Sequence, residues 1–150
     1  MAEQKLQPSE IRLGGSTYKL SAKWRALTRI VESLSPQSRG AYSHMDAVRD
    51  LWRVEANGSI YINCHVLTTM LWAFMHVEER NGTLTWAGMS FDEVADRVGE
   101  FIEESGSVRQ GEVALFLLVL NQLYCDRVIE QKVTDENPTE AVEAATAKAN

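Results

Sequence analysis

Two histidines and one glutamate are the residues whose types and spacing come closest to a metal site. His65 and His76 recur after about three helical turns, which places them on nearly the same face of a helix, and Glu79 follows one turn later. A metal site needs about three or four converging ligands with supporting hydrogen bonds. No further ligand at a familiar spacing accompanies these residues. We therefore predict no metal and interpret both histidines as the polar margin of a buried helix.

Other reactive combinations are weaker. Cys64 adjoins His65, but neighbouring helical residues point about 100° apart and cannot easily share a proton. We interpret Cys64 and Cys125 as buried thiols of a reducing compartment. Carboxylates gather between positions 92 and 104, where they suit the solvent face of a capped helix. Gly14-Gly15 lacks the rest of any phosphate-binding motif. The sequence thus predicts no catalytic residue and no cofactor.

An N-terminal β-hairpin is predicted at about residues 10–20. Ile11 and Leu13 alternate with polar neighbours, as do Tyr18 and Leu20. Gly14-Gly15 between them supplies the positive φ values that a tight hairpin turn requires.

Five helices are predicted after the hairpin. The first is capped by Ser21, begins near Trp24 and stops at Ser35-Pro36. We expect Asn57-Gly58 and Asn81-Gly82 to cap the C-terminal ends of the second and third helices. The other four helices are expected over about 43–56, 60–80, 90–104 and 107–129, the last three beginning or ending at Ser and Gly signals. The predicted fold class is mainly α: an N-terminal β-hairpin followed by a bundle of about five helices, then a disordered C-terminal tail.

Length and composition limit the class of protein. With 150 residues, 45% hydrophobic and 24% charged, the chain fits a single helical domain at 1–133 and a flexible tail at 134–150. The net charge of −6 and the scattered basic residues disfavour nucleic-acid binding. The N-terminus carries no apolar signal segment, and no apolar run reaches the roughly 18 residues that span a bilayer. We expect a cytoplasmic protein without a membrane partner.

An excess of apolar surface on the third and fifth predicted helices is the remaining functional signal. Leu, Phe, Met and Trp spread around both helices instead of following one stripe. One interpretation is a central helix pair that the other helices cover. The second is that part of this surface binds a partner or another copy of the chain. For the second interpretation we select Trp72, Met75, Leu115 and Leu118 as partner-binding residues.

The order of these elements resembles the tail assembly chaperones of long-tailed bacteriophages and the related tail-assembly proteins of gene transfer agents. The resemblance covers roughly Ile11 to Ile129 and contains no catalytic signature. It rests on the hairpin, a Ser-capped first helix ending near Glu32, the run Leu71-Trp72-Ala73-Phe74-Met75, the helix start Met89-Ser90-Phe91-Asp92-Glu93-Val94 and a Leu-rich last helix.

The resemblance implies a non-enzymatic protein of viral tail morphogenesis. Such a chaperone acts in the host cytoplasm, binds the tape-measure protein, with the tail-tube subunit as a further partner, and is not expected in the mature virion. A homo-oligomer stays open, and such families often extend the product by ribosomal frameshifting, here after Thr134. The alternative is a small helical adaptor or regulatory protein of unrelated lineage that binds a host or viral partner.

Overall fold

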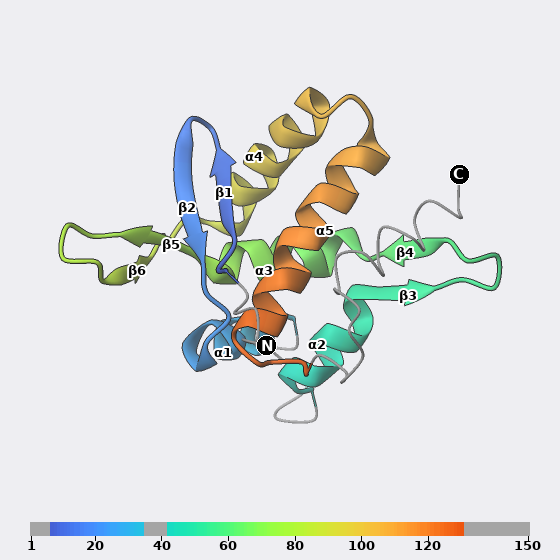
Figure 1. The fold of residues 1–150 in the computed structure, drawn as a ribbon, viewed down its shortest axis with the longest axis horizontal. Helices are drawn as coiled ribbons and strands as arrows, with labels where there is room; N and C mark the ends of the chain where they lie inside the picture. Colours follow the sequence, from blue (N-terminus) through green and yellow to red (C-terminus); the bar gives the residue numbers. More distant parts are fainter. Residues whose placement is uncertain (1–6, 35–41, 131–150) are drawn as a thin grey trace, which may run out of the picture.

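The computed structural model describes residues 7–34 and 42–130, which form five helices and six strands (Figure 1). The predicted mainly helical bundle is therefore wrong: this part of the chain is a small α/β fold that keeps the N-terminal hairpin and adds two more. The predicted tail at 134–150 lies outside the described residues. The elements are β1 (Glu10–Leu13), β2 (Ser16–Leu20), α1 (Trp24–Leu34), α2 (His44–Leu51), β3 (Trp52–Val54), β4 (Ile60–Ile62), α3 (Cys64–Phe74), β5 (Met75–Glu78), β6 (Leu84–Trp86), α4 (Phe91–Glu104) and α5 (Val108–Cys125).

Two antiparallel sheets flank the helices. The larger sheet has the strand order β1-β2-β5-β6, and β3 pairs with β4 in a separate two-stranded sheet. The β3–β4 hairpin and the β5–β6 hairpin extend from opposite sides of the helical body (Figure 1). We call these hairpins the β3–β4 arm (residues 52–62) and the β5–β6 arm (residues 75–86).

The predicted N-terminal hairpin is confirmed. Gly14 and Gly15 have φ angles of 58° and 82°, and Leu13 pairs with Ser16 across the turn. Two successive positive φ values are the pattern of the tight turn that suits the twist of paired strands. Ile11 and Leu13 point into the core, where both are 2% exposed. The hairpin thus covers part of the helical body.

The predicted third helix at 60–80 is wrong, because this segment divides into β4, α3 and β5. The two Asn-Gly pairs that we expected to cap helices instead form the turns of the two arms. Gly58 and Gly82 have φ angles of 86° and 84°. A positive φ after asparagine fits both a helix end and a hairpin turn. Strand pairing with residues 52–54 and 84–86 decides between them.

Two helix ends and one helix cap also differ from the prediction. The second helix ends at Leu51, because the chain continues directly into β3. α5 ends at Cys125, where Arg127 has a φ of 59° and the Val128 N–H donates to the Leu123 carbonyl, as in a Schellman motif. Ser21 does not cap α1, since it lies before the cap position and donates its N–H to Phe74.

Serine caps at three helix starts match the sequence signals. Ser43, Ser90 and Ser107 each accept a hydrogen bond from the backbone N–H three residues later, at 3.3, 3.1 and 3.1 Å. Each bond satisfies a donor that the first helical turn leaves without a partner. The beginnings of α2, α4 and α5 are therefore defined locally.

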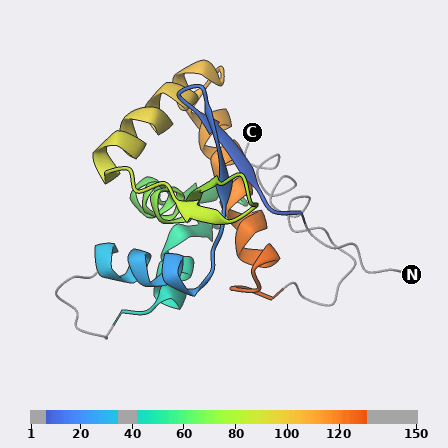
Figure 2. The ribbon, with the colours of Figure 1, turned by 90° about the vertical axis from the view of Figure 1, so that its left-hand side faces the viewer.

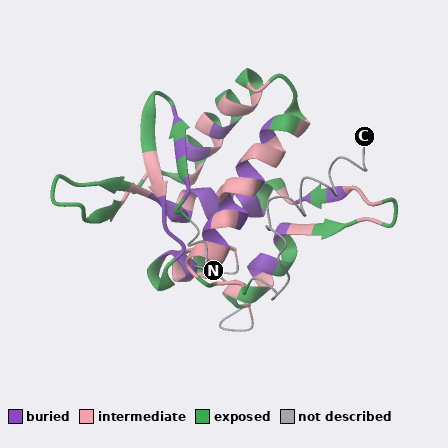
Figure 3. Ribbon diagram, viewed as in Figure 1, coloured by how far each residue is buried: buried purple, intermediate pink, exposed green. Residues whose placement is uncertain are grey.

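α3 is the centre of the molecule. It packs against α1, α2, α4 and α5, and α5 crosses it (Figures 1 and 2). Buried segments concentrate on α3 and on the inner face of α5 (Figure 3). Phe74 and Phe116 are fully buried side chains of these two helices. Much of the apolar surplus in the sequence is therefore core. No helix within the described ranges is long and apolar enough to cross a membrane.

A buried polar cluster joins the start of the described chain to the end of α5. Gln122, 2% exposed, accepts a hydrogen bond from the Ser9 N–H at 2.8 Å and donates to the Asp126 carboxylate at 2.7 Å. The same carboxylate oxygen accepts the Ala22 N–H at 2.6 Å. These bonds fix both ends of the N-terminal hairpin to one helix end. We call this group the polar clasp (Ser9, Ala22, Gln122 and Asp126).

Replacing Ser90 with alanine is expected to lower the free energy of unfolding by about 1 kcal/mol. The reason is that the Glu93 N–H loses its side-chain acceptor. Ser90→Asn keeps an acceptor and serves as the control. Denaturant unfolding measures both variants. An unchanged midpoint for Ser90→Ala would show that this serine does not stabilise α4.

Asp46 is expected to make stability depend on pH. Its carboxylate accepts the Ser43 N–H at 2.7 Å, and this bond, followed by smaller contributions from the Ser43 hydroxyl and Arg49, lowers the pKa of Asp46. A carboxyl whose pKa is lowered by folding stabilises the fold at neutral pH and loses that effect as pH falls through the folded-state pKa. Asp46→Asn should therefore lower the melting temperature at neutral pH but not in strong acid. An equal difference at both pH values would contradict this.

Candidate partner-binding surface

The residues considered for a metal site do not lie on one helix face. His65 is on α3, His76 is on β5 and Glu79 is in the turn of the β5–β6 arm. The His65 ring packs 5.3 Å from the Phe91 ring, and His76 Nδ1 donates to the Phe74 carbonyl at 2.8 Å. Within residues 7–34 and 42–130, no group of three or more His, Cys, Asp and Glu side chains is arranged to hold a metal.

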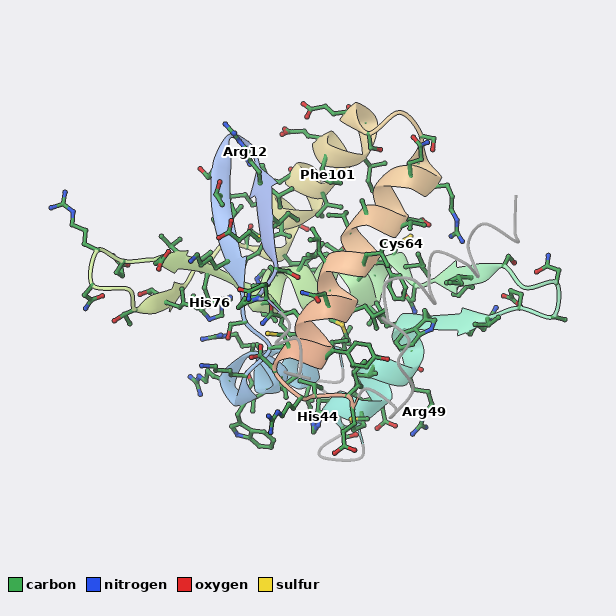
Figure 4. All side chains as sticks on the ribbon, in the orientation of Figure 1. Arg12, His44, Arg49, Cys64, His76 and Phe101 are labelled. Atoms are coloured by element: carbon green, nitrogen blue, oxygen red, sulfur yellow. The ribbon has the colours of Figure 1, made fainter. Side chains whose placement is uncertain are left out.

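Cys64 is exposed, so the prediction that it is a buried thiol is wrong; Cys125 is half-buried. Cys64 and His76 lie at opposite ends of α3 (Figure 4). The Cys64 thiol donates to Glu112 at 3.3 Å. Partial desolvation and then Glu112 raise the pKa of Cys64, which disfavours the thiolate that a nucleophile needs. This arrangement is the opposite of an activated cysteine.

The four residues selected for partner binding are mostly inside the molecule. Met75 and Leu115 are 0% exposed and belong to the core. Trp72 and Leu118 are half-buried. The Trp72 indole N–H donates to the Met89 carbonyl at 2.7 Å, and the Leu118 carbonyl accepts the Ser9 hydroxyl at 2.8 Å. These four residues form no exposed patch, because the N-terminal hairpin and the neighbouring helices cover α3 and α5.

Trp72 belongs to an aromatic cluster that fastens α1 to the β5–β6 arm. Its ring meets Trp86 edge-on at 5.4 Å, and the Trp86 indole N–H donates to the Trp72 carbonyl. The Arg29 guanidinium of α1 lies 4.1 Å from the centre of a Trp86 ring. Burial, more than the neighbouring Arg25, lowers the pKa of Arg29. The cation–π contact therefore compensates part of the desolvation of this cation.

Exposed large apolar residues lie on other elements than α3. The first turns of α1, α2 and α5 and both arms carry them (Figure 3). Protein partners commonly bind through such residues when they gather on one surface. They are Trp24, Met45, Val54, Tyr61, Val77, Leu84 and Val108.

The β3–β4 arm is fixed firmly to the body at its root. The Trp52 ring packs 5.4 Å from the buried Phe116 ring of α5. Arg109, also on α5, donates to the Ile60 carbonyl at 2.7 Å. Ile60 and Ile62 are each 4% exposed. A two-stranded ribbon is only marginally stable by itself, so these contacts hold the arm in its projecting position.

The outer part of the β3–β4 arm presents residues typical of interfaces. Val54 is 60% exposed and Tyr61 46% exposed. The Arg53 guanidinium lies 4.4 Å from the centre of the Tyr61 ring. A hollow of about 220 Å³ at the root is lined by Arg49, Trp52, Arg53 and Tyr61, together with Asp50 and Asn63. Arg, Tyr and Trp are enriched among residues that contribute most to binding. Because paired residues share a face, Arg53 and Tyr61 lie on one face of the arm, and Val54 lies on the other face with Ile60. We call the face of Arg53 and Tyr61, together with the edge at Val54, the arm surface.

Our sequence interpretation missed the arm surface, although a signal for it exists. Asn57-Gly58 is flanked by Trp52-Arg53-Val54 and Ile60-Tyr61-Ile62, short runs rich in aromatic and β-branched residues. Asn-Gly between such runs is a strong hairpin signal. The same analysis applies to Asn81-Gly82 in the β5–β6 arm. Because we interpreted both Asn-Gly pairs as helix ends, we did not predict the two projecting hairpins.

Comparisons with known proteins provide no relative from which the role of this surface could be inferred. No family model, curated protein or solved structure matches this chain significantly.

Proposed function

We propose that this protein is a non-enzymatic tail assembly chaperone of a long-tailed bacteriophage. It acts in the host cytoplasm, holds the tape-measure protein before tail assembly and leaves before the virion matures. The tail-tube subunit is a second partner in this proposal. The observation that carries the binding function is the anchored β3–β4 arm with its exposed Arg53, Val54 and Tyr61.

The composition of the arm surface supports a protein partner. Its exposed aromatic and aliphatic side chains gain from leaving water, and the Arg53 guanidinium, which also donates to Glu55 at 3.0 Å, lies beside Tyr61. The net charge of −6 suits a carrier that does not bind nucleic acid. The hairpin and the cap at Ser90 are elements on which the resemblance to tail assembly chaperones rests.

The expected mode of binding follows from the chemistry of the partner class. A tape-measure protein is a long helical chain that exposes apolar faces until assembly, and an amphipathic helix binds well to an apolar surface with a polar rim. The arm surface together with the hollow at its root offers apolar contact beside Arg49, Arg53 and Asn63. We propose that one helix of the tape measure lies across the face that carries Arg53 and Tyr61, next to the hollow.

Coexpression with the long helical protein encoded beside this chain tests the proposal. The chain should keep that protein soluble and copurify with it, and Tyr61→Asp or Arg53→Glu should reduce the copurified amount at least about tenfold. Val108→Asp is the matched control, because Val108 is also exposed, at 66%, but lies on the first turn of α5. Circular dichroism confirms that each variant folds.

The possible outcomes test the chaperone function and the location of the binding site separately. If the chain neither solubilises nor copurifies with its neighbour, the chaperone function is wrong and the adaptor alternative replaces it. If both arm variants bind as well as the unchanged protein, the arm surface is not the binding site.

A further inference from the structure

A second hollow lies between α1 and the β5–β6 arm and has a different character. It is a shallow hollow of about 490 Å³ that is open to solvent, and α1 lies beside this arm in both ribbon views (Figures 1 and 2). Lys23, Arg25 and Ala26 line it from α1 and the residues before it, and His76 and Leu84 line it from the arm. We call this hollow the α1 cleft.

Two exposed cations, Lys23 and Arg25, line the α1 cleft. Among the described residues, neither Lys23 nor Arg25 takes part in an ion pair, and the first turn of α1 carries no acidic residue. Two carboxylates close to the cleft are engaged elsewhere: Glu78, the cross-strand partner of Leu84, binds Lys19 at 2.8 Å, and Asp126 accepts hydrogen bonds from the Ala22 N–H and from Gln122. A cationic hollow on a chain of net charge −6 therefore stands out as a place for an anionic partner.

The cleft also has an apolar side. Leu84 is 37% exposed, and Ala26 next to the two cations is 2% exposed. A small anion such as phosphate would leave this apolar wall in water, whereas a peptide can place carboxylates on the cations and an aliphatic side chain on Leu84. Nucleic acid fits less well, because its phosphate backbone needs an extended positive face, whereas the basic residues of this chain are scattered.

We propose that the α1 cleft binds an acidic protein segment in which aspartate or glutamate alternates with an aliphatic residue. Lys23 and Arg25 bind its carboxylates, and Leu84 contacts its aliphatic side chain. The proposal is independent of the arm surface and of the tape measure, since it concerns a separate hollow and a chemically defined segment.

Fluorescence anisotropy with a labelled peptide of repeated Glu-Leu-Glu units tests this proposal. The unchanged protein should bind it, and affinity should fall as salt rises. The double variant Lys23→Glu/Arg25→Glu should bind at least about tenfold more weakly. Leu84→Ser should also weaken binding. Arg12→Glu is the matched control, because Arg12 is an exposed cation on β1, away from α1 (Figure 4), and it should bind as the unchanged protein does.

Three probes distinguish the acidic segment from other occupants. A Gln-Leu-Gln peptide, inorganic phosphate and a single-stranded oligothymidine should each compete poorly. Equal binding of the Gln-Leu-Gln peptide, stronger binding of phosphate or oligothymidine, or no effect of the double variant would each overturn the proposal. None of these outcomes depends on a tail protein, so this experiment and the test of the chaperone function can fail independently.

Discussion

Replacing Gln122 with leucine is expected to lower the free energy of unfolding by about 3 kcal/mol. Leucine has a similar volume, so the packing around α5 changes little, but it removes both hydrogen bonds of the buried amide. The Ser9 N–H then loses its acceptor in a site where Ser9 is only 5% exposed. Asp126 loses a donor to its carboxylate. Buried polar groups without partners are the main cost of such a change.

A milder substitution in the polar clasp, Asp126→Asn, serves as the comparison for Gln122→Leu. Asp126→Asn keeps an oxygen that can accept the Ala22 N–H, so it should cost only about 1 kcal/mol. Chemical denaturation of the three proteins measures the difference. A loss of less than about 1 kcal/mol for Gln122→Leu would show that the clasp does not hold the N-terminal hairpin to α5. Hydrogen exchange of the Ser9 and Leu20 amides gives a local readout of the same contact.

Two helical glycines should respond to alanine in opposite directions. A Cβ at Gly111 on α5 would lie 2.9 Å from Ile102 Cγ1 and 3.0 Å from Ile102 Cα of α4. Because one of these atoms is backbone, α4 and α5 would have to move apart. We expect Gly111→Ala to lower the free energy of unfolding by about 2 kcal/mol despite the better helix propensity of alanine.

Gly99 provides the matched comparison on the neighbouring helix. It is exposed on α4, and a Cβ there would have no heavy atom within 4 Å. Gly99→Ala should therefore raise the free energy of unfolding by about 1 kcal/mol through helix propensity alone. Thermal unfolding of both variants decides the matter. Stabilisation by Gly111→Ala would show that α4 and α5 do not pack closely at this point.

Local chemistry explains which predictions succeeded. The N-terminal hairpin depends on two adjacent glycines, and the helix starts at Ser43, Ser90 and Ser107 depend on a hydroxyl near an N–H three residues later. Both devices act within a few residues of the chain, so the sequence is enough to recognise them.

The two arms needed information from outside their own segments. A short apolar run such as residues 60–62 or 75–78 suits a helix or a strand equally, and Asn-Gly suits a helix end or a hairpin turn. Pairing of Trp52 with Ile62 and of His76 with Trp86 settled both cases. The predicted continuous helix failed because those partners are supplied by the neighbouring strand.

The division between core residues and candidate site residues also depended on contacts with distant segments. The sequence by itself determined that the segments of α3 and α5 carry more apolar residues than one helix face needs. It also determined the N-terminal hairpin and the helix starts at the three serine caps. Only the tertiary structure decided that Met75 and Leu115 lie inside while Val54 and Tyr61 lie outside. The physical reason is that exposure depends on which distant segments cover a residue, here the N-terminal hairpin and α4 over α3 and α5. The arm surface and the α1 cleft exist because nothing in the described chain covers them.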